Sequence, residues 1–185
     1  MRTLVWTLVL ALVLAGCGGE AAPLPYESNE TGNAELDEAV YGVLETLYQP
    51  DGTEAENLAA VYGWVSEEIA YRAGTADVSG GFTEELIQEL ALEGLSKRRG
   101  NCDTEAAVMA ALLERLGYGC EILQGQFLRE DGQWVDHAWV RAEVDGEWLH
   151  FDPLYGRYYA EDPADYCMQP DSALEGTHRW EAGED

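Results

Sequence analysis

Most of the first half of the chain has the apolar spacing of amphipathic helices. In the segment 54–70 the apolar residues recur every three or four positions, which places them on one helical face. These residues are Leu58, Val61, Val65 and Ile69. Thr53 and Glu56 form a capping box in front of the segment, which predicts where this helix begins. Weaker patterns of the same kind predict helices over 35–47 and 83–92.

A further helix is predicted to begin directly after Asn101, a suitable N-cap residue. The apolar residues at helical spacing are Ala106, Met109, Ala110, Leu113 and Leu116. Gly100 gives the backbone freedom before the cap, and Gly117 is a suitable terminator. Cys102 is then the first residue of this helix, where the helix dipole favours a thiolate.

The second half of the chain is rich in Val, Trp, Phe and other strand-forming residues. We expect strands near 120–128, 134–144 and 147–152. Asp145-Gly146 separates the last two, and Asp-Gly between two such runs predicts a two-residue hairpin turn. Helices followed by an antiparallel sheet indicate an α+β fold. There is no internal repeat and no phosphate-binding glycine loop.

The N-terminus has the pattern of an export signal. Arg2 precedes the apolar run 4–14, which is too short to span a membrane as a mature helix. Leu14-Ala15-Gly16-Cys17 resembles the bacterial lipobox, in which Cys17 would be acylated and become the first mature residue. An ordinary secretory peptide with a chance cysteine is the alternative. The expected organisation is a signal peptide over 1–16, a tether over 17–33 and one folded domain over 34–185.

The composition excludes some partners. The chain has 10 Lys and Arg against 36 Asp and Glu, a formal net charge of −26, so it lacks the basic surface that nucleic acid needs. Attraction to anionic lipids is also excluded, and membrane attachment would rely on the acyl anchor. The acidity either keeps the protein soluble or attracts cationic or amine-bearing substrates. We expect an extracytoplasmic, lipid-anchored monomer of the bacterial cell envelope that needs no cofactor.

Three residues carry the candidate chemistry, namely Cys102, His137 and Asp152. A thiol, an imidazole and a carboxylate are the parts of a thiol-based acyl-transfer enzyme. The hairpin register places His137 and Asp152 on one face as diagonal neighbours, with Cα atoms roughly 7–8 Å apart. In the same register Trp139 faces Asp152, and His137 faces Leu154.

The neighbouring polar and aromatic residues have simpler interpretations. Asp103 and Glu105 lie in the first helical turn and oppose a thiolate, but we expect an imidazolium in a cleft to outweigh them. His150 and His178 are interpreted as packing residues. Trp139 either belongs to the core or shields the histidine–carboxylate pair from water.

The order of these motifs resembles the transglutaminase-like superfamily, in its bacterial cysteine-protease-like branch. The resemblance runs from about Leu58 to Trp180. The motifs that carry it are Val61-Tyr62-Gly63-Trp64-Val65, Ile69-Ala70-Tyr71, Gly100-Asn101-Cys102, Leu116-Gly117-Tyr118, His137-Ala138-Trp139, Trp148 to Asp152-Pro153, Pro170 to Leu174 and His178-Arg179-Trp180. The resemblance implies a papain-like fold with N-terminal helices packed on an antiparallel sheet.

The resemblance also implies the roles of the site residues. Cys102 would be the nucleophile, His137 the general base and then the acid, and Asp152 would orient His137 and stabilise its cation. The family commonly follows this aspartate with Pro-Thr, whereas this chain has Pro153-Leu154, a difference that removes no catalytic atom.

The oxyanion-binding groups are only partly identified by the sequence. The backbone N–H of Cys102 is one natural donor. Related papain-type enzymes place a Gln shortly before the cysteine, and here Ser96 stands in that neighbourhood. Tyr71 is the other candidate, and the position stays unassigned.

The expected function is acyl transfer at a peptide or protein amide. Hydrolysis and transamidation use the same residues, and hydrolysis is favoured because it needs no second binding site. The alternatives are a catalytically silent binding module of the cell envelope and a thiol redox protein, although there is no Cys-x-x-Cys motif. A disulfide between Cys120 and Cys167 stays open. A metal site built from the thiol, imidazole and carboxylate lacks the short ligand spacing typical of zinc sites.

Overall fold

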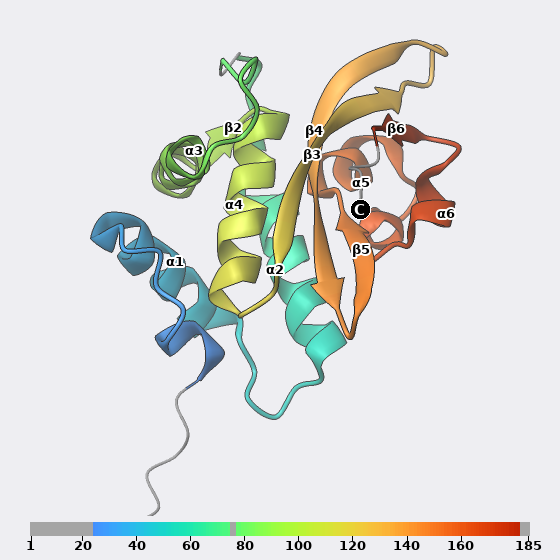
Figure 1. The fold of residues 1–185 in the computed structure, drawn as a ribbon. Helices are drawn as coiled ribbons and strands as arrows, with labels where there is room; N and C mark the ends of the chain where they lie inside the picture. The colour runs from blue at the N-terminus through green and yellow to red at the C-terminus, as the bar shows by residue number, and fades with distance from the viewer. Residues whose placement is uncertain (1–23, 75–76, 182–185) are drawn as a thin grey trace, which may run out of the picture.

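The computed structural model describes residues 24–74 and 77–181 (Figure 1). The predicted signal peptide, Cys17 and the start of the predicted tether lie outside these residues. Within the described part of the chain, no helix combines the length and the apolar composition that a membrane span requires.

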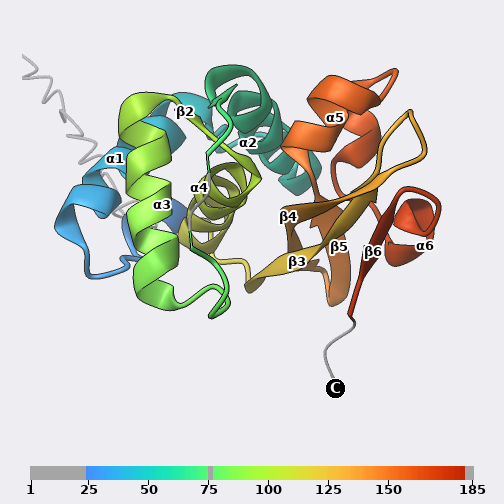
Figure 2. The same cartoon turned by 90° about the horizontal axis from the view of Figure 1, so that it is seen from above.

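Four helices form one side of the molecule: α1 (Ala34–Leu47), α2 (Glu54–Glu68), α3 (Glu84–Lys97) and α4 (Cys102–Arg115). Helix α4 lies between α1 and α3 on one side and the strands on the other (Figure 2). The predicted capping box is present at α2, where Glu56 N–H donates to Thr53 Oγ1 and Thr53 N–H donates to the Glu56 carboxylate.

Helix α4 is the centre of the core. We expected one buried face, but every residue from Asp103 to Leu113 is buried. The apolar spacing understates this burial because the run is rich in alanine, whose small side chain allows neighbouring elements to approach on all sides. The helix that carries Cys102 is therefore held rigidly by both halves of the fold.

The strands form a four-stranded antiparallel sheet in the order β5-β4-β3-β6. Their bounds are β3 (Cys120–Leu128), β4 (Trp134–Val144), β5 (Glu147–Phe151) and β6 (His178–Trp180). The predicted hairpin register is confirmed, because Val144 pairs with Glu147. Asp145 and Gly146 both have positive φ, 53° and 81°, as a type I′ turn requires. The predicted α+β fold is confirmed.

A second, two-stranded parallel sheet joins the segment after α2 to the segment before α4. It pairs β1 (Ala70–Tyr71) with β2 (Arg99–Gly100), and Tyr71 lies opposite Gly100. The backbone N–H of Arg72 also donates to the carbonyl of Gly100 at 2.7 Å. This pairing brings Tyr71 beside the beginning of α4.

Helix α3 is longer than predicted, since it continues from the expected end near 92 to Lys97. The reason is contact with α4: Gly94 faces Thr104 and Val108 so closely that a Cβ at Gly94 would overlap them. The helix ends at Arg98, which has the left-handed conformation with φ 52°. A glycine that weakens a helix pattern is here the residue that permits two helices to pack together.

The segment after β5 differs from the prediction. We expected a strand through Asp152 with Leu154 opposite His137, but β5 ends at Phe151. Asp152 instead caps helix α5 (Pro153–Tyr159), and its Oδ1 accepts the backbone N–H of Tyr155 at 2.9 Å. Aspartate at the N-cap followed by proline at the first helical position is a strong helix start, so the correct assignment was readable from the sequence. A short 3-10 helix (Pro163–Tyr166) and α6 (Asp171–Leu174) follow α5.

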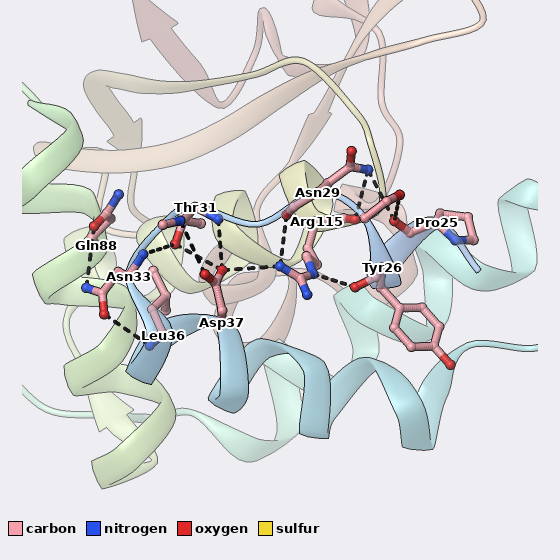
Figure 3. A network of polar contacts seen from close by, with 11 residues as sticks. Pro25, Tyr26, Asn29, Thr31, Asn33, Leu36, Asp37, Gln88 and Arg115 are labelled. Carbon is pink, nitrogen blue, oxygen red and sulfur yellow. Dashed lines mark hydrogen bonds and ion pairs between the residues drawn. The ribbon is translucent and has the colours of Figure 1, made fainter. Parts of the chain in front are cut away.

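Residues 24–33, which we assigned to the tether, pack against the domain. Arg115 of α4 donates to the carbonyls of Tyr26 and Asn29 and forms an ion pair with Asp37 at 3.2 Å (Figure 3). Both charged side chains are largely buried, 4% and 12% exposed. Tyr26 is buried as well. The buried Arg115 guanidinium thus binds the segment 24–33 to the helices. A domain boundary at residue 34 would therefore divide a packed unit.

Candidate active site

Cys102 begins α4 as predicted, and its local structure explains the position. Asn101 caps the helix, since its side-chain oxygen accepts the backbone N–H of Thr104 at 3.2 Å. Gly100 does not have a positive φ. It is required instead for space, because a Cβ there would overlap the side chain of Thr104. Cys102 is half-buried and lines a cleft of about 1020 Å³.

His137 on β4 and Asp152 meet as predicted. His137 Nε2 lies 2.7 Å from Asp152 Oδ2, and both side chains are buried, 1% and 2% exposed. The imidazole stacks on Trp139, with ring centroids 5.7 Å apart and an angle of 17°, and it meets Phe127 edge-on at 4.9 Å. Two aromatic rings therefore hold the imidazole, and Trp139 covers one of its faces.

The contact with Asp152 occupies Nε2 of His137, which leaves Nδ1 for the side of the cleft. His137 and Cys102 line the same cleft, and the nearby Cys102 side chain helps to raise the pKa of His137. The structure therefore brings the three predicted residues together in the order thiol, imidazole, carboxylate.

The electrostatics favour an ionised histidine–carboxylate pair. Burial by itself lowers the pKa of His137, but the charge of Asp152 and its hydrogen bond, together with the nearby Cys102, raise it to about 10. Burial by itself raises the pKa of Asp152, but the charges and hydrogen bonds of His137 and His178 hold it well below its usual range. Opposite charge and hydrogen bonding to the charged form thus outweigh desolvation at both groups.

His178 was interpreted as a packing residue, and the structure places it in the site. Its Nε2 lies 2.8 Å from Asp152 Oδ2, the oxygen that also contacts His137. Strand β6 brings it there by pairing His178 with Phe127 of β3. No local pattern indicates this contact, because the two strands are about fifty positions apart in the sequence.

His150 lies on the same face of the sheet as His137, as predicted. Both of its ring nitrogens have partners outside the cleft. Trp139 Nε1–H donates to His150 Nδ1 at 2.9 Å, so Nε2 carries the hydrogen and donates to Asp171 at 2.7 Å. Burial lowers the pKa of His150 despite the nearby Asp171. The neutral imidazole therefore connects Trp139 to α6, which fixes the ring on which His137 stacks.

Two acidic residues follow Cys102 in the first turn of α4, and their surroundings differ. Asp103 Oδ2 accepts Asn101 Nδ2–H at 2.7 Å, and its Oδ1 lies 3.9 Å from Cys102 Sγ. Glu105 is 1% exposed, and burial raises its pKa to about 8 although Arg157 opposes this. The expected repulsion of a thiolate by Glu105 is therefore weakened near neutral pH.

Glu105 also links the nucleophile helix to the helix that follows Asp152. Its Oε1 lies 2.6 Å from Arg157 Nη2 of α5. Arg157 donates in addition to the carbonyls of Ser66 and Ile69 at the end of α2. Glu105 Oε2 and Arg157 Nε have no hydrogen-bond partner among the described residues. The Glu105–Arg157 contact therefore ties α4, α5 and the end of α2 together.

The structure distinguishes the two candidates for the second oxyanion donor. Ser96 is exposed in α3, where its hydroxyl donates to the carbonyl of Leu92, and it is not among the described residues that line the cleft. Tyr71 does line the cleft, and burial together with the nearby Cys102 raises its pKa. Its phenol stays protonated at neutral pH and can act as a donor.

Acidic residues predominate among the charged groups of the cleft. Among the described residues they are Asp77, Asp103, Asp136 and Glu181, against the basic residues Arg179 and His137. Arg179 contacts Gln126 and lies over the ring of Trp134 at 4.4 Å. The carboxylates of the four acidic residues make the cleft a suitable surface for a cationic group.

The groups with metal-binding potential differ from those considered in the sequence. The ligand atoms of His137, Asp152 and His178 lie within 4.8 Å of one another, and nitrogen and oxygen ligands of this kind suit zinc. The two short hydrogen bonds to Asp152 account for the same arrangement. Cys120 and Cys167 are both free thiols in the structure, so the disulfide left open does not form.

Comparison with known families and structures gives a consistent result. The sequence profile of the transglutaminase-like superfamily matches residues 42–153, a range that includes Cys102, His137 and Asp152. No curated protein sequence matches this chain.

Several solved structures are similar. A transglutaminase ("TGase") structure has a TM-score of 0.51 and 16% identity over 74% of this chain and 37% of its own. A protein from Cytophaga hutchinsonii, assigned provisionally as a cysteine protease, has a TM-score of 0.49 and 16% identity over 79% of this chain and 45% of its own. An arylamine N-acetyltransferase from Bacillus cereus, described with a Cys-His-Glu triad, has a TM-score of 0.46 and 18% identity over 66% of this chain and 50% of its own. The chain thus spans half or less of the length of each of these proteins. The similarity to the transglutaminase structure supports the fold alone.

Proposed function

The chain belongs to the transglutaminase-like superfamily, and we propose that it is a thiol-dependent acyl-transfer enzyme that acts at amide bonds. One observation carries the proposal: a buried histidine–carboxylate pair, 2.7 Å apart, shares a cleft with a cysteine at the first position of a helix. Fold membership alone does not imply activity, but this arrangement supplies nucleophile, base and orienting carboxylate in the positions that acyl transfer needs.

In the proposed reaction the Cys102 thiolate attacks the carbonyl carbon of the substrate. A C–S bond forms, and the carbonyl electrons move to oxygen, for which we assign the backbone N–H of Cys102 and the phenol of Tyr71, which lines the cleft, as donors. The intermediate collapses, the C–N bond breaks, and the His137 imidazolium gives its Nδ1 proton to the leaving amine. The product is a thioester and a neutral His137.

The second half of the reaction restores the enzyme. Water or an amine attacks the thioester carbonyl, and His137 Nδ1 takes the proton from the attacking group. The C–S bond then breaks, and the thiolate and imidazolium are re-formed. Asp152 keeps its negative charge throughout and stabilises the cation. We favour hydrolysis, because the cleft opens between exposed residues such as Tyr71 and Asp136, through which water can enter.

The substrate proposed is a peptide or protein amide that carries a positive charge. The acidic residues of the cleft and the net charge of −26 support this choice, since an acidic cleft raises the local concentration of cations. For such a substrate kcat/KM should fall as salt is raised, and a flat salt response would exclude the charge argument.

We also propose that the protein is a monomer held at the bacterial envelope through an acylated Cys17. The sequence Leu14-Ala15-Gly16-Cys17 after an apolar run supports this proposal. Mass spectrometry of protein from the bacterial membrane tests it, because the N-terminal peptide should begin at Cys17 and carry acyl groups. An N-terminal peptide that begins elsewhere, or an unmodified Cys17, would exclude the anchor.

The central experiment measures activation of the thiol. Wild-type protein is treated with iodoacetamide at pH 6.5, and mass spectrometry quantifies modification of the peptide that contains Cys102. Fast labelling that collapses in His137→Ala is expected. His150→Asn is the matched control, since its side-chain oxygen can take the place of Nδ1 and still accept the indole N–H of Trp139, and it should retain fast labelling.

Labelling of Cys102 at the rate of a free thiol, unaffected by His137→Ala, would refute an activated nucleophile and favour the silent binding module. If the thiol is activated, release of ammonia or amine from peptide amides, with and without added primary amines, separates hydrolysis from transamidation.

A further inference from the structure

A second histidine is bound to the carboxylate of the proposed triad. His178 Nε2 lies 2.8 Å from Asp152 Oδ2, and His137 Nε2 lies 2.7 Å from the same atom. The other carboxylate oxygen, Oδ1, accepts the backbone N–H of Tyr155. Asp152 is 1% exposed and His178 is 2% exposed. Three donors from three different elements therefore surround one buried carboxylate.

The hydrogen bonds define which nitrogen of His178 carries a hydrogen. An ionised carboxylate only accepts, so Nε2 of His178 must be the donor. The hydroxyl of Thr177 lies 2.9 Å from Nδ1 and can donate to it, whereas its contact with the carbonyl of Leu174 is longer, at 3.3 Å. The contact with Asp152 thus requires a hydrogen on Nε2 of His178, and Thr177 holds the ring in the orientation that presents it.

The surroundings make this donor hard to replace. The ring of His178 packs against Tyr155, Trp139 and Tyr166, with centroids 4.8, 5.0 and 5.7 Å away. These aromatic rings leave the imidazole fully enclosed, so water cannot readily take over the hydrogen bond to Asp152. Loss of the N–H would leave Oδ2 with His137 as its only side-chain donor and would make the carboxylate a stronger proton acceptor.

We propose that His178 is a positioning residue that acts through Asp152. The proposal rests on the acyl-transfer function above and extends it. His178 keeps Asp152 ionised and holds Oδ2 in line with Nε2 of His137, so that the proton of the imidazolium stays on the histidine and Nδ1 stays directed toward Cys102. His178 itself does not line the cleft and touches no substrate.

Two variants separate the hydrogen bond from the volume of the side chain. His178→Gln keeps an N–H at about the position of Nε2, and His178→Leu fills the space without a donor. The rate of Cys102 alkylation by iodoacetamide is measured from pH 5 to pH 9 in the full chain. For His178→Leu we expect a rate at pH 6.5 about tenfold below wild type, as loss of one hydrogen bond to a charged group implies, and a pH midpoint shifted upward. His178→Gln should restore both.

The outcomes distinguish this proposal from the function on which it rests. If wild-type Cys102 is activated but His178→Leu keeps its midpoint, the positioning role is wrong and the acyl-transfer proposal survives. If the melting temperature falls in both variants while neither midpoint moves, His178 is only structural. If the wild type shows no His137-dependent activation, the acyl-transfer proposal itself fails.

A measurement on the wild-type protein keeps the proposal testable if His178→Leu does not fold. Nitrogen-15 NMR of the histidine side chains identifies which ring nitrogen carries the hydrogen. His178 should carry a hydrogen at Nε2 at neutral pH. The opposite tautomer would overturn the proposal, because Nε2 without a hydrogen cannot donate to Asp152.

Discussion

Replacing Asp152 with Asn tests the electrostatic argument with little change in shape. The Asn side-chain oxygen can still accept the backbone N–H of Tyr155, so the cap of α5 survives. The amide nitrogen then stands where Oδ2 now contacts Nε2 of both His137 and His178. Donor would face donor at both contacts, so each histidine must move its hydrogen to Nδ1. For His137 this is the nitrogen directed toward Cys102, and it can no longer act as a base.

The size of the effect follows from the pKa of His137. Its increase from 6.5 to about 10 corresponds to about 5 kcal/mol of net preference for the imidazolium, at roughly 1.36 kcal/mol per unit. Without the carboxylate, burial dominates and His137 is neutral at pH 7. An ordinary thiol with a pKa of about 8.5 is about 1% ionised at pH 6.5, so alkylation of Cys102 should fall up to about 100-fold. Amide turnover should fall about 10³-fold to 10⁴-fold, as expected for the wrong tautomer in such triads.

The assay is iodoacetamide alkylation at pH 6.5, read from the peptide that contains Cys102. Burial raises the pKa of Cys167 to about 12 and raises that of Cys120 further, so these two thiols should react slowly in both proteins and serve as internal references. Circular dichroism and the melting temperature establish that the Asn variant is folded. A folded Asp152→Asn protein whose Cys102 reacts within about twofold of the wild-type rate would refute the ion-pair argument.

Three further predictions concern residues around the site. The folded-state pKa of Glu105 is raised to about 8, so the wild type should lose stability, by up to about 5 kcal/mol, as pH rises from 4.5 to 8; Glu105→Gln should flatten this dependence in urea titrations at several pH values. Arg115→Met leaves the buried Asp37 without its ion-pair partner and should lower the free energy of unfolding by about 3 kcal/mol. The segment 24–33 should then become sensitive to proteolysis. The control Lys97→Ala removes an exposed ion pair and should cost under about 0.5 kcal/mol. Gly100→Ala should lower both the melting temperature and the alkylation rate of Cys102, because its Cβ would displace the first turn of α4; an unchanged rate would argue against a rigidly placed nucleophile.

Local chemistry accounts for what could be predicted. The turn at Asp145-Gly146 sets the register of β4 and β5, and a register with period two decides which side chains share a face. This is why the meeting of His137 and Asp152 was predictable. The N-cap at Asn101 likewise defines the position of Cys102 at the start of α4. Each feature depends on residues within about fifteen positions of one another.

The misassignments have two different causes. The end of β5 was a local error, since Asp152-Pro153 is a helix start whose chemistry was visible but was interpreted as part of a strand. The full length of α3 and the complete burial of α4 were not local, because Gly94 has its function only in contact with Thr104 and Val108. Packing between helices decides such cases, and it overrides the weak apolar pattern of each helix alone.

The sequence by itself determined the elements, the hairpin register, the histidine–carboxylate pair and the position of the thiol, because caps, turns and strand alternation act over short stretches of chain. Only the tertiary structure decided that His178 completes the environment of Asp152, that Glu105 is buried against Arg157, and that Arg115 binds the segment 24–33. These contacts join residues about 26 to 90 positions apart. Their partners are selected by the packing of the whole core, which no local pattern records.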